Sequence, residues 1–307
     1  MGLRIRTNIQ SLTAQRNLLE STNKVSTHMQ RLSSGYRINK AADDAAGLAI
    51  SESLKSDIRS MAQARRNAND GVSLLQVAEG GLDEINNIMT RLRELSVQAA
   101  SDTIGMRERQ YLNLEFMQLK DEVDRIAVST QFNGTHLLVG NAPLDPSIMK
   151  DHNYSPLEIQ VGKDYLTPPD SLDSPNPINI IRFDFRNVIA MTGGEGGLGI
   201  GTSLDENGTR VDSKQSAQHS MAILDEAITK VSSYRAFFGS MQSRLVSTDR
   251  NLAIGMENLS AAKSRIQDAD FAQETAEYTQ ANILQQAGVS VLAQANQMPQ
   301  VVLKLLQ

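Results

Sequence analysis

The chain has 307 residues, a formal net charge of −5 at pH 7 and no cysteine. The absence of cysteine excludes disulfides, cysteine-ligated zinc and thiol catalysis, and the acidic balance argues against general nucleic-acid binding. Aromatic residues make up 4% of the chain and tryptophan is absent, so the apolar content is mainly the aliphatic mixture that fills helix–helix seams.

The start of the chain has no signal-peptide pattern, because no apolar run follows its charged residues. The sequence also lacks a run of about 18 apolar residues, which a membrane-spanning helix needs. From residue patterns alone we expect no membrane insertion, and a cytoplasmic protein unless a dedicated route exports it.

Residues 5–32 carry apolar residues at helical spacing among Gln, Asn, Ser and Thr. The apolar positions form one stripe and a second, shifted one, and we expect this segment to be one half of a terminal coiled coil. The two stripes consist of Ile5, Ile9, Leu12 and Leu19, and of Leu18, Val25, Met29 and Leu32.

A long helix is predicted from about residue 44 to residue 100, beginning after Asp43 and Asp44. Its seam follows a 3-4 spacing, slips by one position near Gly80 and Gly81, and then continues. The two glycines predict a weak point or bend at the slip. The predicted seam includes Leu54, Ile58, Met61, Ala68, Val72, Leu75, Leu82, Ile85, Met89, Leu92 and Ala99, and a third helix has Leu112, Phe116, Leu119, Val123 and Ile126.

The centre of the chain, residues 131–212, holds seven of the eight prolines and reads as hairpins and loops. Asn133 and Gly134 predict a tight turn, and residues 157–161 and 178–185 predict strands. The motif Gly194-Glu195-Gly196-Gly197-Leu198-Gly199 fits a phosphate-binding pattern, but no helix pattern follows it directly. We therefore expect a flexible surface loop there.

The carboxy-terminal arm is predicted to be helical, with a heptad seam from Met221 to Leu259 and a final apolar stripe. This stripe consists of Leu284, Val291, Met298, Val302 and Leu305, with Gly288 and Ala295 between them. Chain ends are usually frayed and polar, so an apolar end favours burial against a partner, with docking against the rest of the same chain as the alternative. The few large side chains cannot alone offset the entropy of ordering the segment. We therefore expect both ends to be largely disordered in the monomer and helical once neighbouring subunits cover them.

No catalytic constellation is visible. No two of the four histidines, His28, His136, His152 and His219, lie four residues apart, and none belongs to a metal-ligand motif. Neither a P-loop nor a G-x-S-x-G motif occurs. We expect no enzyme activity, no cofactor and no metal site.

Several long motifs, in order, resemble the bacterial flagellins. They cover about residues 1–138 and 215–307. They include Arg31-Leu32-Ser33-Ser34-Gly35-Tyr36-Arg37-Ile38-Asn39, Ala41-Ala42-Asp43-Asp44-Ala45-Ala46-Gly47-Leu48-Ala49-Ile50, Gln131-Phe132-Asn133-Gly134 and Ser264-Arg265-Ile266-Gln267-Asp268-Ala269-Asp270.

The resemblance implies a mainly α fold: an elongated helical hairpin with coiled-coil terminal helices, a rod-like helical bundle and a small central β-hairpin region. It divides the chain into five parts. Residues 1–43 and 263–307 form the inner coiled-coil domain, residues 44–130 and 213–262 the rod, and residues 131–212 a short variable region. The resemblance implies a subunit that polymerises with itself into the flagellar filament and serves swimming motility.

The resemblance also implies partners. These are the flagellar type III export machinery, an export chaperone, and the filament cap and junction proteins. Some flagellins are recognised by a vertebrate innate immune receptor, and Arg91 and Leu95 match positions used there, while Asp121 stands where those flagellins have Glu. Three alternatives remain open: a hook–filament junction protein, a secreted enzyme with its site in residues 131–212, and a cytoplasmic coiled-coil adaptor.

Overall fold

The structure is a computed structural model that describes residues 8–140, 157–164, 179–193, 196–203, 205 and 208–305. It confirms the mainly helical fold, with small antiparallel strand pairs in the central region. The chain divides into two compact units, described separately below. The terminal unit comprises residues 1–58 and 257–307, and the inner unit comprises residues 59–256. The described helices are α1 (Ile9–Ser34), α2 (Ala45–Ala100), α3 (Met106–Ser129), α4 (Lys214–Gln267) and α5 (Phe271–Leu305).

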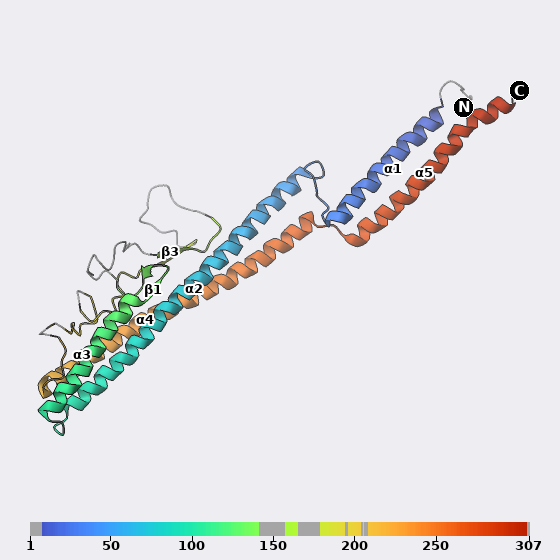
Figure 1. The fold of residues 1–307 in the computed structure, drawn as a ribbon. Coiled ribbons are helices and arrows are strands. Elements are labelled where there is room, and N and C mark those ends of the chain that lie inside the picture. Colours follow the sequence, from blue (N-terminus) through green and yellow to red (C-terminus); the bar gives the residue numbers. More distant parts are fainter. Residues whose placement is uncertain are drawn as a thin grey trace, which may run out of the picture. The chain divides into compact units, whose positions relative to one another are not determined.

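In the inner unit, α2, α3 and α4 contribute to one hydrophobic core and run alongside one another (Figure 1). Arg65 pairs with Asp249, and Arg93 farther along α2 pairs with Asp225, so α2 and α4 run in opposite directions. Most members of the predicted seams between Ala68 and Leu245 face this core, whereas Leu54, Ile58 and Met61 at the start of the predicted seam are half-buried outside it. Its fully buried members include Leu82, Met89, Leu92, Phe116, Val123, Val231 and Phe238.

The helix predicted from about 44 to 100 is observed as α2, beginning at Ala45. Asp44 lies at its start and its carboxylate accepts a hydrogen bond from the Gly47 backbone N–H at 2.9 Å. The helix stays continuous through Gly80 and Gly81. A Cβ at Gly81 would lie 2.6 Å from Thr130 Oγ1, so the absence of a side chain there allows residue 130 to approach the helix.

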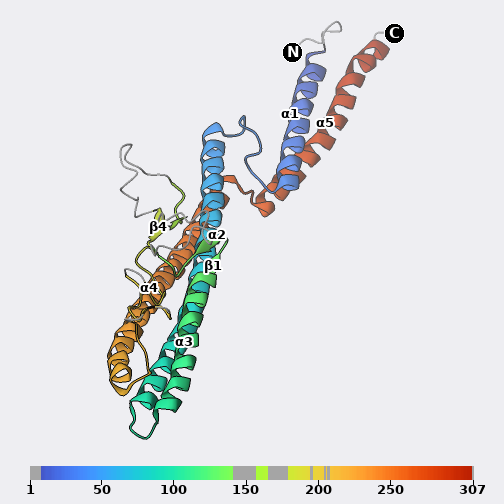
Figure 2. The same ribbon diagram turned by 60° about the vertical axis from the view of Figure 1, so that its left-hand side comes forward.

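Two antiparallel strand pairs belong to the central region (Figure 2). Strands β1 (Gln131–Phe132) and β2 (Thr135–His136) are joined by Asn133 and Gly134, both with positive φ, as the predicted tight turn requires. Strands β3 (Leu157–Gln160) and β4 (Ile180–Phe183) confirm the other two strand predictions. Phe183 and Ile181 on β4 are buried in the core.

The expectation of a loop on the surface at residues 194–199 is wrong for Gly197 and Leu198, which are buried. Leu198 is buried in the core next to Ile200, and Lys230 donates a 2.8 Å hydrogen bond to the Gly196 carbonyl. Gly194 and Glu195 lie outside the described residues. The glycine content suggested mobility, but the two apolar side chains supply enough burial to hold the segment in place.

A buried lysine ties the same loop region to α3. The Lys120 ammonium donates 3.2 Å hydrogen bonds to the carbonyls of Thr202 and Thr209. Burial lowers the pKa of Lys120 from its ordinary 10.5 to about 8, despite the opposing charges of Asp124 and Asp205. Asp124 accepts hydrogen bonds from the backbone and hydroxyl of Thr192 at 2.7 and 2.6 Å.

Candidate assembly surface

In the terminal unit, α1 and α5 lie side by side in opposite directions (Figures 1 and 2). Near one end of the pair, the Asn8 side chain donates a 2.8 Å hydrogen bond to the Ala295 carbonyl. Near the other end, His28 lies 2.6 Å from a carboxylate oxygen of Glu274. As the residue number increases along α1, the residue number of its contact on α5 decreases, so the two helices are antiparallel.

The fully buried apolar positions of the seam between these helices are small residues, and the larger Leu18, Val25 and Leu32 are only half-buried. Ala281, Gly288 and Ala295 follow one another at intervals of seven on α5, as in a coiled coil. A Cβ at Gly288 would lie 3.3 Å from the side chain of Leu18, so the two helices approach closely there. On α1, Ser11 and Ala14 are buried. Residues this small remove little apolar surface from water.

The large apolar side chains of the pair point mostly away from the seam. Leu19 on α1 is 64% exposed, and Leu284 and Val291 on α5 are 51% and 55% exposed. Among the described side chains of α1 and α5, ten large apolar ones are exposed: Ile9, Leu12, Leu19, Met29, Phe271, Ile283, Leu284, Val289, Val291 and Met298. Exposed apolar residues gathered on two neighbouring helices indicate an interaction surface, whereas scattered ones do not.

The structure therefore separates the residues of the predicted coiled-coil stripes into two groups. Exposed members are Ile9, Leu12, Leu19, Met29, Leu284, Val291 and Met298, whereas Leu18, Val25 and Leu32 are half-buried. Ile5 lies outside the described residues, and Val302 and Leu305 are described only as backbone of α5. The larger group is available to a partner, and the intramolecular seam uses other positions.

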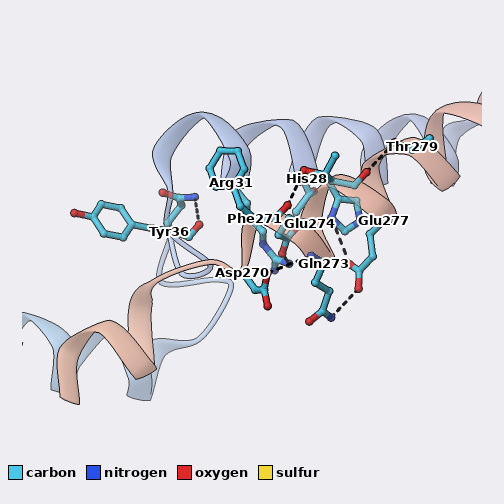
Figure 3. A network of polar contacts seen from close by, with 12 residues as sticks. His28, Arg31, Tyr36, Asp270, Phe271, Gln273, Glu274, Glu277 and Thr279 are labelled. Carbon is cyan, nitrogen blue, oxygen red and sulfur yellow. Dashed lines mark hydrogen bonds and ion pairs between the residues drawn. The ribbon is translucent and has the colours of Figure 1, made fainter. Parts of the chain in front are cut away.

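A polar network interrupts the seam near the start of α5 (Figure 3). Arg31 Nη1 donates a hydrogen bond of 3.1 Å to Glu274 Oε1, while His28 Nδ1 lies 2.6 Å from Glu274 Oε2 and 3.6 Å from Glu277 Oε2. Burial raises the pKa of Glu274, but its hydrogen bonds to His28 and Arg31 and their charges outweigh burial and leave the pKa below 4.5. The carboxylate is therefore charged at neutral pH.

This network was missed from the sequence because its members come from helices at opposite ends of the chain. Among the described residues, His28, Glu274 and Glu277 are the one group of His and acidic side chains whose potential ligand atoms all lie within 4.8 Å of one another. The spacing of Glu274 and Glu277 predicts that both lie on one face of α5. The sequence does not predict that His28, which is 246 residues from Glu274, lies opposite them.

A short backbone link also joins the two ends of the chain. The Arg37 backbone N–H donates to the Gln267 carbonyl at 2.7 Å, and the Ala269 N–H donates to the Gly35 carbonyl at 3.0 Å. Gly35 ends α1 with a φ of 73°, a conformation that glycine adopts without strain. These bonds connect the segment after α1 to the segment before α5.

The three residues matched to receptor contacts differ in accessibility. Arg91 is half-exposed and forms ion pairs with Glu94 and Glu115 at 3.1 and 2.9 Å. Asp121 is exposed. Leu95 is fully buried in the core of the inner unit, so in this structure it cannot be a direct surface contact.

None of the described helices has the length and apolarity to cross a lipid bilayer. Two protein families match the chain: the bacterial flagellin N-terminal helical region over residues 5–142, and the bacterial flagellin C-terminal helical region over residues 221–306. The two matched regions contain α1 to α3, most of α4 and all of α5.

Relatives match over almost the whole chain. A flagellin of Halalkalibacterium halodurans is 40% identical over 98% of both chains. A flagellin of Bacillus subtilis is 40% identical over 99% of this chain and 100% of its own. Among solved structures, a protein described as a flagellar hook-associated protein from Vibrio parahaemolyticus is 15% identical, with a TM-score of 0.54 over 74% of this chain and 100% of that chain. That likeness concerns the fold alone.

Proposed function

The chain belongs to the bacterial flagellin family and is a structural subunit of the flagellar filament, and we propose that the exposed apolar faces of α1 and α5 are the surface through which its subunits polymerise. Subunits that repeat the same contact head to tail form an open helical lattice. The family is one of structural proteins, and we propose that this chain has no enzyme activity.

The single observation that carries this proposal is the inverted burial of the terminal pair. The fully buried apolar residues of its seam are small: Ala14, Ala281 and Ala295. Leu18, Val25 and Leu32 are only half-buried, and other large residues such as Leu19 and Val291 are exposed. A helix pair with this arrangement gains little from its own contact and much from neighbours that cover its outer faces.

The ordering of the ends follows from the same imbalance. An isolated pair of helices must offset the loss of conformational entropy with buried apolar surface, and this pair buries little. We propose that the terminal helices are largely disordered in the free subunit and order on assembly. We also propose that residues 1–43 and 263–307 form the inner coiled-coil domain, residues 44–130 and 213–262 the rod, and residues 131–212 a variable region.

The hook–filament junction alternative shares the fold, since a hook-associated protein matches in structure. Flagellins, however, match at 40% identity over nearly the full chain, against 15% for that protein. The two functions predict different behaviour of the purified protein. A filament subunit grows long filaments from seeds without other proteins, whereas a junction protein does not.

The proposed surface is tested by placing amides where apolar side chains are exposed. We expect the double variant Leu284→Gln, Val291→Gln to lose seeded polymerisation, measured by light scattering and electron microscopy, with the circular dichroism of the free subunit unchanged. The control, Leu284→Met with Val291→Ile, keeps both positions apolar and should polymerise. Normal filaments from the amide variant would refute the proposed surface.

We further propose that the subunit leaves the cell unfolded through the flagellar type III export channel, with an export chaperone, and adds to the filament under the cap protein beyond the junction proteins. Family membership supports this route. Recognition by a vertebrate innate immune receptor remains a prediction that rests on the exposed Arg91 and Asp121. A receptor reporter assay with Arg91→Ala tests it, and an unchanged signal would exclude Arg91.

A further inference from the structure

We propose that His28, Glu274 and Glu277 bind a divalent transition-metal ion of the Zn²⁺ class between α1 and α5. The three side chains bring one imidazole nitrogen and two carboxylate oxygens within 4.8 Å of one another. They come from two helices that meet in the seam of the terminal pair (Figure 3). No motif in the sequence marks this group.

The donor set suits Zn²⁺. Zinc binds imidazole nitrogen and carboxylate oxygen at about 2.0–2.2 Å, which places the ligands of a tetrahedral ion about 3.3 Å apart. His28 Nδ1 lies 3.6 Å from Glu277 Oε2 and 2.6 Å from Glu274 Oε2. The first separation already fits, and the second must widen by less than about 1 Å. Mg²⁺ and Ca²⁺ prefer oxygen ligands alone, so the imidazole selects against them.

Neighbouring groups orient the ligands and leave one side open. Arg31 donates to Glu274 Oε1 at 3.1 Å, which fixes that carboxylate and leaves Oε2 facing His28. Carboxylate ligands of bound metals are commonly held by such outer hydrogen bonds. The side chains of His28 and Glu274 are 14% and 9% exposed, and that of Glu277 is 43% exposed. An ion can therefore enter beside Glu277.

Such a site would couple metal binding to the order of the chain ends. His28 and Glu274 are 246 residues apart, so an ion that both ligate holds α1 against α5. Binding free energy at a site absent from the disordered chain stabilises the ordered state. The ion would then increase the helical content of the free subunit without any contact between subunits.

The test uses untagged, full-length, unpolymerised protein with Co²⁺ as a spectroscopic probe. We expect one Co²⁺ per chain, visible d–d absorption that Zn²⁺ removes and Mg²⁺ does not, and a gain of helical circular dichroism on adding Zn²⁺. His28→Ala and Glu277→Gln should each weaken Co²⁺ binding at least about tenfold. His219→Ala, which removes an exposed histidine on α4, should leave it unchanged.

Two results would overturn the proposal: Co²⁺ binding of equal strength in all variants, or no saturable binding by the original protein. Glu277 is half-exposed, so Glu277→Gln tests the site even if His28→Ala disturbs the helix pair. The measurements are made before assembly. A failure to polymerise would therefore count against the proposed function and leave the metal result unaffected.

Discussion

The terminal unit and the inner unit use their apolar residues in opposite ways. In the inner unit, large side chains such as Phe116, Leu82 and Phe238 are fully buried. In the terminal unit, the buried apolar side chains among the described residues are Ala14, Ile38, Ala281 and Ala295, while ten large ones on α1 and α5 are exposed. The contrast supports the proposal that neighbouring subunits complete the terminal unit, whereas the inner unit contains a core of its own.

The largest expected effect tests whether the inner unit is stable without contacts to other subunits. Phe116→Ala removes a ring that is fully buried in its core, and we expect the free energy of unfolding of the free subunit to fall by about 3–5 kcal/mol. Urea denaturation followed by circular dichroism measures it. The matched control is Leu114→Ala, two residues away on α3 and 64% exposed, which should change stability by less than about 0.5 kcal/mol. Equal losses would contradict the assigned core.

The next effect concerns the close contact in the terminal pair. Gly288→Val places methyl groups against Leu18, whose side chain lies 3.3 Å from the position of a Cβ. We expect a cost of about 1–3 kcal/mol per subunit, seen as a lower temperature of filament disassembly. Ala287→Val, at the exposed neighbouring position, is the control and should have a smaller effect. If both variants disassemble alike, the seam does not pass through Gly288.

The start of α2 could be predicted from the sequence, whereas the seam between α1 and α5 could be predicted only in part. The predicted start of α2, about residue 44, lies within one residue of the observed Ala45, because a 3-4 apolar pattern and two acidic residues marked it. The seam of the terminal pair was predicted only in part. Gly288 and Ala295 belong to the predicted final stripe and do lie in the seam, whereas Ala14 was in neither amino-terminal stripe. Larger residues of the predicted stripes, such as Leu284, are exposed.

Two other features lay beyond local patterns. The burial of Leu198 and Ile200 depends on core side chains from distant segments. The sequence around these two residues has no regular apolar spacing that would predict their burial. The contact of His28 with Glu274 depends on how α1 and α5 align. Each helix was predictable from neighbouring residues, whereas their register depends on contacts between residues more than two hundred positions apart.

A smaller effect should appear in the pH dependence of the inner unit. Lys120 has a pKa of about 8 in the folded chain and 10.5 when unfolded. Between these values the unfolded chain binds more protons, so the free energy of unfolding should rise as the pH increases from about 8. Urea denaturation between pH 8 and 9.5 measures the rise, and Lys120→Met should abolish this part of it. If stability instead falls over this range, and Lys120→Met removes the fall, then folding raises the pKa of Lys120 and the prediction is wrong.

The smallest expected change in the unfolding free energy of the free subunit best tests the difference between the terminal unit and the inner unit. Leu19 is 64% exposed on α1, so Leu19→Ala should change the unfolding free energy of the dilute subunit by less than about 0.5 kcal/mol. Its contribution should appear only in the polymer. Burying a leucine fully is worth about 1.5–3 kcal/mol, and about 1.4 kcal/mol is a factor of ten in an equilibrium constant.

We therefore expect the critical concentration for polymerisation of Leu19→Ala to rise by roughly tenfold or more, measured by sedimentation of filaments at equilibrium. A loss of about 2 kcal/mol in the free subunit with an unchanged critical concentration would mean that Leu19 is already buried before assembly. Since the same Leu→Ala change at exposed Leu114 serves as the reference for the inner unit, the two free-subunit measurements are directly comparable. We expect both Leu→Ala variants to leave the unfolding free energy of the free subunit almost unchanged, and Leu19→Ala alone to raise the critical concentration. That result would show that the terminal helices complete their core with side chains of neighbouring subunits.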